Sequence, residues 1–594
     1  MSPADLVVTD GTVVDGTGAA GRVADVVVHD GRIVAVTDPG DGVAQVPGGA
    51  EVIDAAGCVV APGFVDLHTH YDAQLLWDPS ASPSPLHGVT TVFGGNCGFA
   101  LAPAGEEHAG YLARLMSRVE GIPLPAIEAG VDWRWRTFAE WSGRLEGNMA
   151  VNGGFLAGHS AVRRAVMGDA AVGEEASPAQ IEAMADLLRA TLADGAMGFS
   201  TSRAPTHHDG AGDPVPSRFA TDDELLALCA VVSEFPGTQL EAIVPGCING
   251  FSEEEKALLA AMSATARRPL NWNVLAQAGV DPPTNQLDAS DVAAARGGRV
   301  VALTLPQGMR LRLSFLSGMI LDALPGWADV FGLAVPERIA ALSDPEVRRR
   351  MDAGAQSPEA GMIGLLAKWQ RLRIVETFAP ENARWEGGTV GDVAAATGQD
   401  PFDALLDIVV ADGLRTGLAP TMPPEAPEVW RARAELWRDP RVVVGGSDAG
   451  AHLDMMCGAT YSTFLVGEAV RDHGLLTMEE AVQLLTGAPA GLYGLRDRGR
   501  IAPGLAADLV VFDPATVGAG PDRTRDDLPG GASRLVAEAT GVEHVVVNGV
   551  EIVRGGAFTG ATPGAFLRSG TDTATVPVGP SSTSPTPTPQ EDQP

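Results

Sequence analysis

Two histidines separated by one residue, His68-Thr69-His70, follow an apolar run at residues 58–65. Because side chains alternate between the two faces of a strand, both imidazoles project from the same side, about 6.5–7 Å apart. Two imidazoles at that spacing can bind one divalent cation, and imidazole suits zinc, iron or nickel. The pair therefore predicts a metal site. The alternative is two unrelated surface or core histidines.

A cysteine stands where the next predicted strand ends, in Gly94-Gly95-Asn96-Cys97-Gly98. The glycines allow the backbone to turn tightly and hold the thiol at the end of the strand. Gly-Phe-Val-Asp precedes the histidine pair, and this Asn-Cys-Gly sequence follows one strand later. Together the two motifs favour metal binding over the alternative.

An aspartate ends a third strand-like run, residues 441–448, which closes with Gly445-Gly446-Ser447-Asp448. A carboxylate that faces the two histidines could bind the cation and accept a proton from its water. A bound metal lowers the pKa of water to about 7, and the aspartate would pass the proton to a leaving nitrogen. The alternative is an aspartate that starts a turn or caps a helix. The preceding glycines and His452 favour the catalytic interpretation.

The elements that must position these residues alternate between strand and helix patterns. Helical patterns occupy 178–194 and 222–234, and eight strands are expected at 63–68, 90–94, 150–154, 198–201, 238–244, 270–275, 300–305 and 442–446. This alternation predicts an α/β fold, a (β/α)8 TIM-like barrel over residues 62–495. Chemistry in such barrels lies at the carboxyl ends of the strands, where His68, His70, Cys97 and Asp448 fall. Residues 308–386 fit the alternation poorly and are interpreted as an inserted lid.

The two ends of the chain share a pattern of short strands and turns. Residues 1–61 and 496–568 are predicted to pair into one small β-sandwich domain, with two independent hairpins as the alternative. The tail at 569–594 is rich in Ser, Thr and Pro. It has few large apolar residues to offset the entropy of ordering, so we expect it to be disordered.

Composition narrows the class of protein. The 594 residues carry a net charge of -34, which disfavours nucleic acid and anionic membranes as partners and leaves a small-molecule substrate. Five scattered cysteines indicate reduced thiols and a cytoplasmic protein. We find no signal peptide and no apolar run of the roughly 20 residues needed to span a bilayer. A homo-oligomer is possible.

Several of these segments resemble the amidohydrolase superfamily, and more narrowly its N-acyl-D-amino-acid deacylase (D-aminoacylase) branch. They are Ala-Asp-Leu-Val-Val near both ends, APGFVDLHTH at 61–70, HGVTT at 87–91, Asn96-Cys97-Gly98 and Gly446-Ser447-Asp448. The resemblance implies hydrolysis of an amide C–N bond. It also implies one divalent metal, expected to be Zn²⁺, with His68, His70, Cys97 and Asp448 as ligands. Asp448 would in addition be the general acid/base.

The sequence departs from that branch at two strands and at one arginine. The deacylases carry histidines at the ends of the fifth and sixth strands, whereas this chain has Glu241 and Asn273 there. Glu241 is either an oxygen ligand or a buried, hydrogen-bonded carboxylate, and Asn273 is interpreted as a polar site residue. Ala459 stands where the branch places an arginine that binds the substrate carboxylate. A hydantoinase- or dihydropyrimidinase-like cyclic-amide hydrolase, or a metal-binding homologue without catalysis, therefore remain alternatives.

Four histidines are weaker candidates for contact with substrate. His207 and His208 lie in a loop after the 198–201 strand, His159 follows the third strand, and His452 follows Asp448. Arg310 and Arg312 could bind an anionic substrate group from the lid, although a solvated lid face is favoured for them.

Overall fold

The computed structural model describes residues 5–44, 50–277, 279–308, 310–318, 320–361, 363–421 and 425–579. Its centre holds two parallel sheets. One has three strands, in the order β6 (Phe64–Asp66), β7 (Val89–Gly94) and β8 (Asn152–Phe155). The other has the order β16 (Val442–Val444), β13 (Val300–Thr304), β12 (Leu270–Leu275), β11 (Gln239–Ile243), β10 (Gly198–Ser202) and β9 (Ala157–Gly158). Each strand that the sequence predicts for this region is present, within a few residues of its expected bounds.

Hydrogen bonds connect the two parallel sheets at both edges. Only one residue separates β8 from β9, and its amide donates to the carbonyl of Gly94 on β7. At the other edge, the segment after β16 pairs in parallel with the segment after β6, through a bridge between Thr69 and Ala449. The first and last parallel strands therefore meet at their carboxyl ends, which is where the predicted site residues lie.

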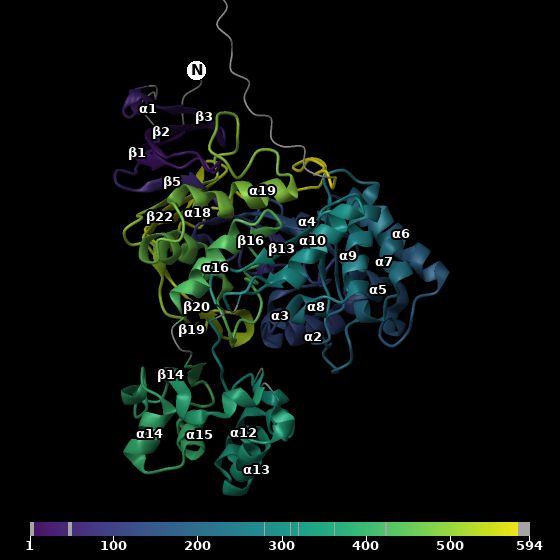
Figure 1. The fold of residues 1–594 in the computed structure, drawn as a ribbon, viewed down its shortest axis with the longest axis vertical. Helices are drawn as coiled ribbons and strands as arrows, with labels where there is room; N and C mark the ends of the chain where they lie inside the picture. The colour runs from purple at the N-terminus through teal and green to yellow at the C-terminus, as the bar shows by residue number, and fades with distance from the viewer. Residues whose placement is uncertain are drawn as a thin grey trace, which may run out of the picture.

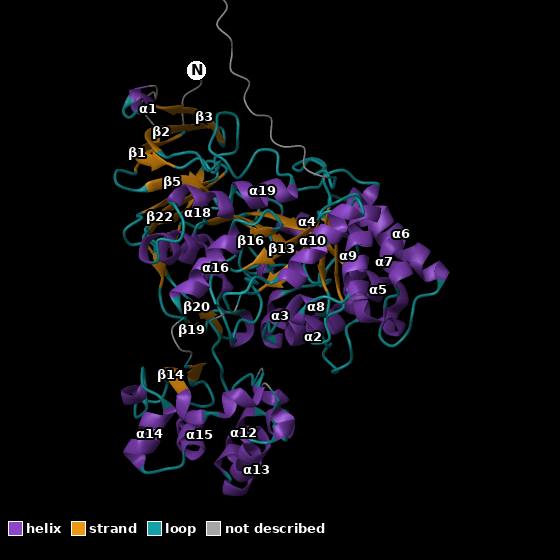
Figure 2. Cartoon of the chain, in the orientation of Figure 1, coloured by secondary structure: helices purple, strands orange, loops and turns teal. Residues whose placement is uncertain are grey.

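Helices cover the parallel strands from outside (Figure 2). They include α6 (Pro178–Ala193), α7 (Asp222–Ser233), α9 (Glu253–Ala266), α10 (Thr284–Ala295), α16 (Pro427–Trp437) and α18 (Met478–Leu485). Several begin with a capping box, as at Ser252, whose side chain accepts from the amide of Glu255 while the glutamate bonds back. Their apolar faces pack on the strands in one large core that buries Trp141, Trp272 and Trp437.

The two ends of the chain form one nine-stranded sheet, at the upper left of Figure 1. Its path is β24 (Ala557–Phe558), β23 (Val550–Arg554), β22 (Val542–Val547), β17 (Leu509–Phe512), β5 (Val59–Pro62), β1 (Leu6–Val13), β2 (Arg22–His29) and β3 (Arg32–Thr37). A further strand, β4 (Glu51–Asp54), pairs with β1. The antiparallel pairing of β17 with β5 joins the C-terminal strands to the N-terminal ones. The two ends are therefore not independent hairpins.

A second hydrophobic core is separate from the core around the parallel strands. It runs from Leu313 to Leu418, past residue 386, where the lid predicted from the sequence ends. This core includes α12 (Val335–Ser343), α13 (Pro345–Ala355), α14 (Val390–Thr397), α15 (Pro401–Ala411) and the strand pair β14 (Leu372–Glu376) and β15 (Gly417–Pro420). These elements form the lower lobe of Figure 1. The packing of α14 and α15 on this core assigns them to the lobe.

The beginning of the C-terminal tail is ordered, contrary to the expectation for 569–594. The hydroxyl of Thr573 donates to the carbonyl of Gly237 at 2.7 Å, and the amide of Ala574 donates to the carbonyl of Gly494 at 2.7 Å. Thr573 and Val576 are both buried. Polar composition misleads here because hydrogen bonds to backbone groups of the body, rather than apolar burial alone, hold the segment. Residues 580–594 lie outside the described part of the chain.

Two other expectations concern helices and cysteines. Among the described residues, no helix has the length and apolar character that a membrane span requires. All five cysteines are described, and each is a free thiol.

The tail contacts give a prediction about stability. A chain that ends at residue 568 should unfold at a temperature several degrees lower than the full chain, since it loses about 2–4 kcal/mol of buried hydrogen bonds and apolar contact. A chain that ends at 579 keeps these contacts and serves as the control. The midpoint of thermal unfolding is measured by circular dichroism for the chains that end at 568 and at 579. Equal midpoints for these two chains would show that residues 569–579 do not stabilise the protein.

Candidate metal centre

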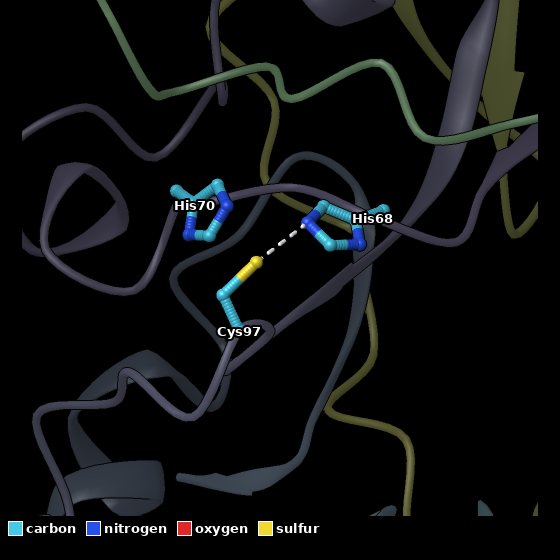
Figure 3. A group of neighbouring side chains, drawn as sticks. All are labelled: His68, His70 and Cys97. Atoms are coloured by element: carbon cyan, nitrogen blue, oxygen red, sulfur yellow. Dashed lines mark hydrogen bonds between the residues drawn. The ribbon is translucent and has the colours of Figure 1, made fainter. Parts of the chain in front are cut away.

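Three side chains converge at the carboxyl ends of β6 and β7. The nearest donor atoms of His68, His70 and Cys97 all lie within 4.8 Å of one another, and all three side chains are buried. The Cys97 sulfur lies 3.4 Å from Nε2 of His68. Figure 3 shows the sulfur directed toward the space between the two imidazoles. Two imidazoles and a thiol form a donor set suited to one transition-metal cation.

Backbone and side-chain hydrogen bonds fix the segment that carries the two histidines. The carboxylate of Asp66 accepts from the amide of His68 and from the hydroxyl of Ser447, on the segment after β16. The side-chain amide of Asn96 donates to the carbonyls of Thr69 and Phe93 at 3.2 and 2.9 Å. The conspicuous Asn-Cys-Gly sequence thus has a physical role, because its asparagine ties the cysteine loop to the histidine segment.

Cys97 adopts a backbone conformation that side chains rarely take, with φ of 55°. In this conformation its amide donates to Oε2 of Glu241 at 2.7 Å. The next amide, of Gly98, donates to the hydroxyl of Ser200 at 3.0 Å. Burial, followed by the charges of Glu241 and Glu120, raises the pKa of the Cys97 thiol well above its usual range. A cation is therefore needed to stabilise the thiolate at this position.

Asp448 approaches the same cluster from the end of β16. Its Oδ1 lies 3.1 Å from Nε2 of His70 and 3.6 Å from Nε2 of His68. Although burial opposes it, hydrogen bonding and charge from His70 hold the pKa of Asp448 below its ordinary value. The structure thus brings together all four residues that the resemblance assigns to the metal.

Glu120 is a site residue that sequence reasoning missed. Its Oε1 lies 3.4 Å from Nδ1 of His70, and its carbonyl accepts from the amide of His452. A carboxylate behind a ligating histidine fixes the tautomer and the orientation of the ring. Although burial lowers it, the charges of Glu120 and Asp448 raise the pKa of His70 to about 9. No motif surrounds Glu120, which ends an ordinary amphipathic helix, α2 (Ala109–Val119).

Glu241 and Asn273 face the cluster from β11 and β12. Besides accepting from the Cys97 amide, Glu241 keeps its other oxygen, Oε1, buried without a hydrogen-bond partner. The Asn273 side-chain amide lies 3.5 Å from Nε2 of His68, and its Oδ1 is likewise buried and unpartnered. Both residues thus contribute polar atoms to the site.

The four weaker histidine candidates separate into two groups. Nε2 of His452 lies 3.6 Å from Oδ2 of Asp448, at the centre. His207 Nδ1 lies 2.7 Å from the hydroxyl of Ser202, and its ring centroid lies 5.2 Å from that of Phe99, two residues after Cys97. His159 is directed elsewhere, because its two ring nitrogens contact Thr201 and Glu224 in the buried body. His208 bonds to the carbonyl of Thr206 in its own loop. The structure does not bring His159 or His208 to the cluster.

The lid arginines make ion pairs within the protein. Arg312 is buried and pairs with Glu376 of β14 at 2.6 Å, which differs from the expected solvated face. Arg310 pairs with Asp522 at 3.4 Å. Arg312 also lines a cavity of about 570 Å³, whose wall includes Gly121, next to Glu120 in the chain, and Asp454, two residues after His452. That wall carries Arg114, Arg118, Arg312, Arg415 and Arg534.

The residues present fit a divalent cation. Besides the unpartnered oxygens of Glu241 and Asn273, the Nδ1 atom of His68 is buried without a hydrogen-bond partner. Buried polar atoms left in this state are costly, and a cation compensates carboxylates and a thiolate that face one another. Donors at the carboxyl ends of parallel strands in an α/β protein define the class of site, a buried metal centre.

Comparisons with known proteins agree with this class. The model of the amidohydrolase family matches residues 51–553. The chain is 30% identical over 577 residues to the D-aminoacylase of Alcaligenes xylosoxydans xylosoxydans, covering 95% of this chain and 98% of the relative. The chain therefore belongs to the amidohydrolase family.

Two solved structures are similar over the full length. One is a D-aminoacylase described by its binuclear metal centre, with TM-score 0.60, 26% identity, and coverage of 95% of this chain and 100% of that one. The other is the N-acyl-D-glutamate deacylase of Bordetella bronchiseptica with zinc and a phosphonate inhibitor, with TM-score 0.61, 25% identity, and coverage of 96% and 100%. Together with the family, they establish a metal-dependent hydrolase of non-peptide C–N bonds.

The cluster predicts that metal binding depends on the thiol. A Cys97→Ala protein should bind Zn²⁺ at least about 10-fold more weakly than the wild type, because a buried ligand is lost. Metal content after dialysis and competition with a chelator measure the change. Cys229→Ala removes another buried thiol, on α7, and should keep wild-type affinity. Equal affinities for the two variants would exclude the sulfur as a ligand.

Proposed function

We propose that this protein cleaves the amide C–N bond of an N-acyl amino acid or a related N-acyl compound. The observation that carries the proposal is the contact of His68, His70 and Cys97 with one another and of Asp448 with both histidines. The relatives that match the whole chain are named for removing acyl groups from D-amino acids or from N-acyl-D-glutamate. In the wall of the adjacent cavity, Arg114 could meet an anionic substrate group, whereas the other four arginines pair with carboxylates of the protein itself.

We further propose that the parallel strands form one closed (β/α)8 barrel over residues 62–495. In support, each of the two parallel sheets is bonded to the other at both edges. The nine-stranded sheet would be a smaller domain built from 1–61 and 496–568. The Leu313–Leu418 lobe would be an insertion that borders the substrate cavity through residues such as Ser314 and Arg415.

The proposed cofactor is one Zn²⁺ ion. Two imidazoles and a thiolate suit zinc, and the structurally similar N-acyl-D-glutamate deacylase was solved with zinc. Within the described residues, one group of three close donors was found, and Asp448 adds to it from the histidine side. When bound, the ion would polarise the substrate carbonyl and lower the pKa of a water molecule to about 7.

The side chains of this protein supply the remaining chemistry. Asp448 is kept deprotonated by His70, so it can accept a proton from the attacking water. As the water oxygen bonds to the carbonyl carbon and the C–N bond breaks, Asp448 returns that proton to the departing nitrogen. Oε1 of Glu120 lies 3.4 Å from Nδ1 of His70, and Nε2 of His452 lies 3.6 Å from Oδ2 of Asp448. The strand-end location of these groups fixes their geometry before substrate arrives.

The role of Asp448 predicts the effect of one substitution. Asp448→Asn should lower kcat by about 10²–10⁴-fold, the usual contribution of a general acid/base. A panel of N-acyl amino acids measures hydrolysis by detection of the free amine, with the metal content of each protein recorded. Asp472→Asn, which changes an exposed carboxylate paired with Arg471, is the control.

Two results would contradict the proposal. Full activity of Asp448→Asn would remove the aspartate from the mechanism. A wild-type protein that binds metal and hydrolyses no amide in the panel would favour the alternative of a metal-binding homologue without catalysis.

A further inference from the structure

The two carboxylate oxygens of Glu241 lie in different environments. The residue lies on β11, and its side chain is fully buried. Oε2 accepts the amide of Cys97 at 2.7 Å, a charge-assisted hydrogen bond that fixes the carboxyl group against the cysteine loop. Cys97, which carries the thiol, therefore also fixes the position of Oε2 of Glu241.

The second oxygen, Oε1, has no hydrogen-bond partner although it is inaccessible to solvent. A buried carboxylate oxygen without a partner carries a desolvation cost of roughly 1–3 kcal/mol or more. The charged groups that act on this carboxyl are His70, which favours its ionised form, and Asp448 and Glu120, which oppose it. The hydrogen bond from the Cys97 amide, at 2.7 Å, places the carboxyl group of Glu241 beside the cysteine loop of the cluster.

A single cation would satisfy this arrangement. It would be shared by the thiolate, the two imidazoles and Asp448, and it would offset the repulsion among Glu241, Asp448 and Glu120. A hydrogen bond to the Cys97 amide alone would not require a carboxylate, because an amide oxygen can accept the same bond. A carboxylate whose second oxygen has no hydrogen-bond partner therefore favours a ligand role for Glu241.

We infer that Glu241 is itself a metal ligand, binding through Oε1 while its Oε2 anchors the Cys97 loop. The inference rests on the proposed function, since it concerns the same centre. The ion would then have a second carboxylate ligand, in addition to the two imidazoles, the thiolate and Asp448. Glu241 would then be linked to Cys97 in two ways, through the shared ion and through the hydrogen bond from the Cys97 amide.

Two substitutions separate the ligand role from the anchoring role. Glu241→Gln keeps an oxygen that can accept the Cys97 amide and removes the second carboxylate oxygen. Glu241→His supplies a different metal ligand and removes the anchor. Zn²⁺ affinity is measured by chelator competition for the wild type and both variants, and Co²⁺ absorption reports the coordination of each. Far-UV circular dichroism and the midpoint of thermal unfolding establish that each variant folds.

A ligand role predicts that Glu241→Gln binds Zn²⁺ at least about 10-fold more weakly than the wild type, and also more weakly than Glu241→His. Wild-type affinity in Glu241→Gln would overturn the inference. So would an affinity of Glu241→Gln equal to or above that of Glu241→His. A wild-type protein that binds no metal at all would instead refute the proposed function.

A second measurement does not depend on how the variants fold. Anomalous diffraction from crystals of the zinc-loaded wild-type protein locates the ion relative to the carboxyl group. Oε1 of Glu241 at about 2.0–2.2 Å from zinc would support the inference, because this is the usual Zn–O distance. A distance above about 3 Å, with the other ligands bound, would overturn it.

Discussion

The pairing of the first and last parallel strands at their carboxyl ends is the constraint on which the site depends. The amide of Asp448 donates to the carbonyl of His68 at 3.1 Å, and the amide of His70 donates to the carbonyl of Ala449 at 2.8 Å. These bonds join segments that are almost 380 residues apart in the sequence. Because the two hydrogen bonds fix the register between them, the carboxylate of Asp448 is directed at both imidazoles.

The second determinant is an excess of acidic groups at the centre. Glu120 and Glu241 are buried there, and the side chain of Asp448 is 20% exposed, in a chain that already carries a net charge of -34. Burial raises the pKa of Glu241 to about 8, although the hydrogen bond from the Cys97 amide and the charge of His70 act to lower it. A cation turns this unfavourable cluster into a stable one, so metal binding and the stability of the site are linked. The same charges that bind the ion also orient the groups that move protons.

Local sequence patterns were sufficient to predict much of the fold and part of the site. The strand at 270–275 has the predicted bounds, and α6 and α7 each end one residue before the predicted position. The histidine pair and Asn96-Cys97-Gly98 identified the centre because their spacing along short strand ends is local information. Asp448 could be included because a β-branched run and two glycines precede it in the sequence.

Other features depend on contacts that no local pattern records. Glu120 ends an amphipathic helix and reaches the centre only through the packing of α2. His159 looked like a pocket residue by position, yet Glu224, 65 residues later, engages its ring in the interior. The lobe extends to Leu418 because α14 and α15 pack on the Trp327 core rather than on the parallel strands. The segment around Thr573 is ordered by backbone groups of Gly237 and Gly494. In each case the deciding partner is remote in sequence.

The central claim is that one cation binds both imidazoles and the thiolate, and X-ray absorption spectroscopy of the zinc-loaded protein tests it most directly. We expect one sulfur at about 2.3 Å from the zinc, together with imidazole nitrogen and other light-atom ligands at about 2.0–2.2 Å. A spectrum with nitrogen and oxygen ligands and no sulfur would contradict it.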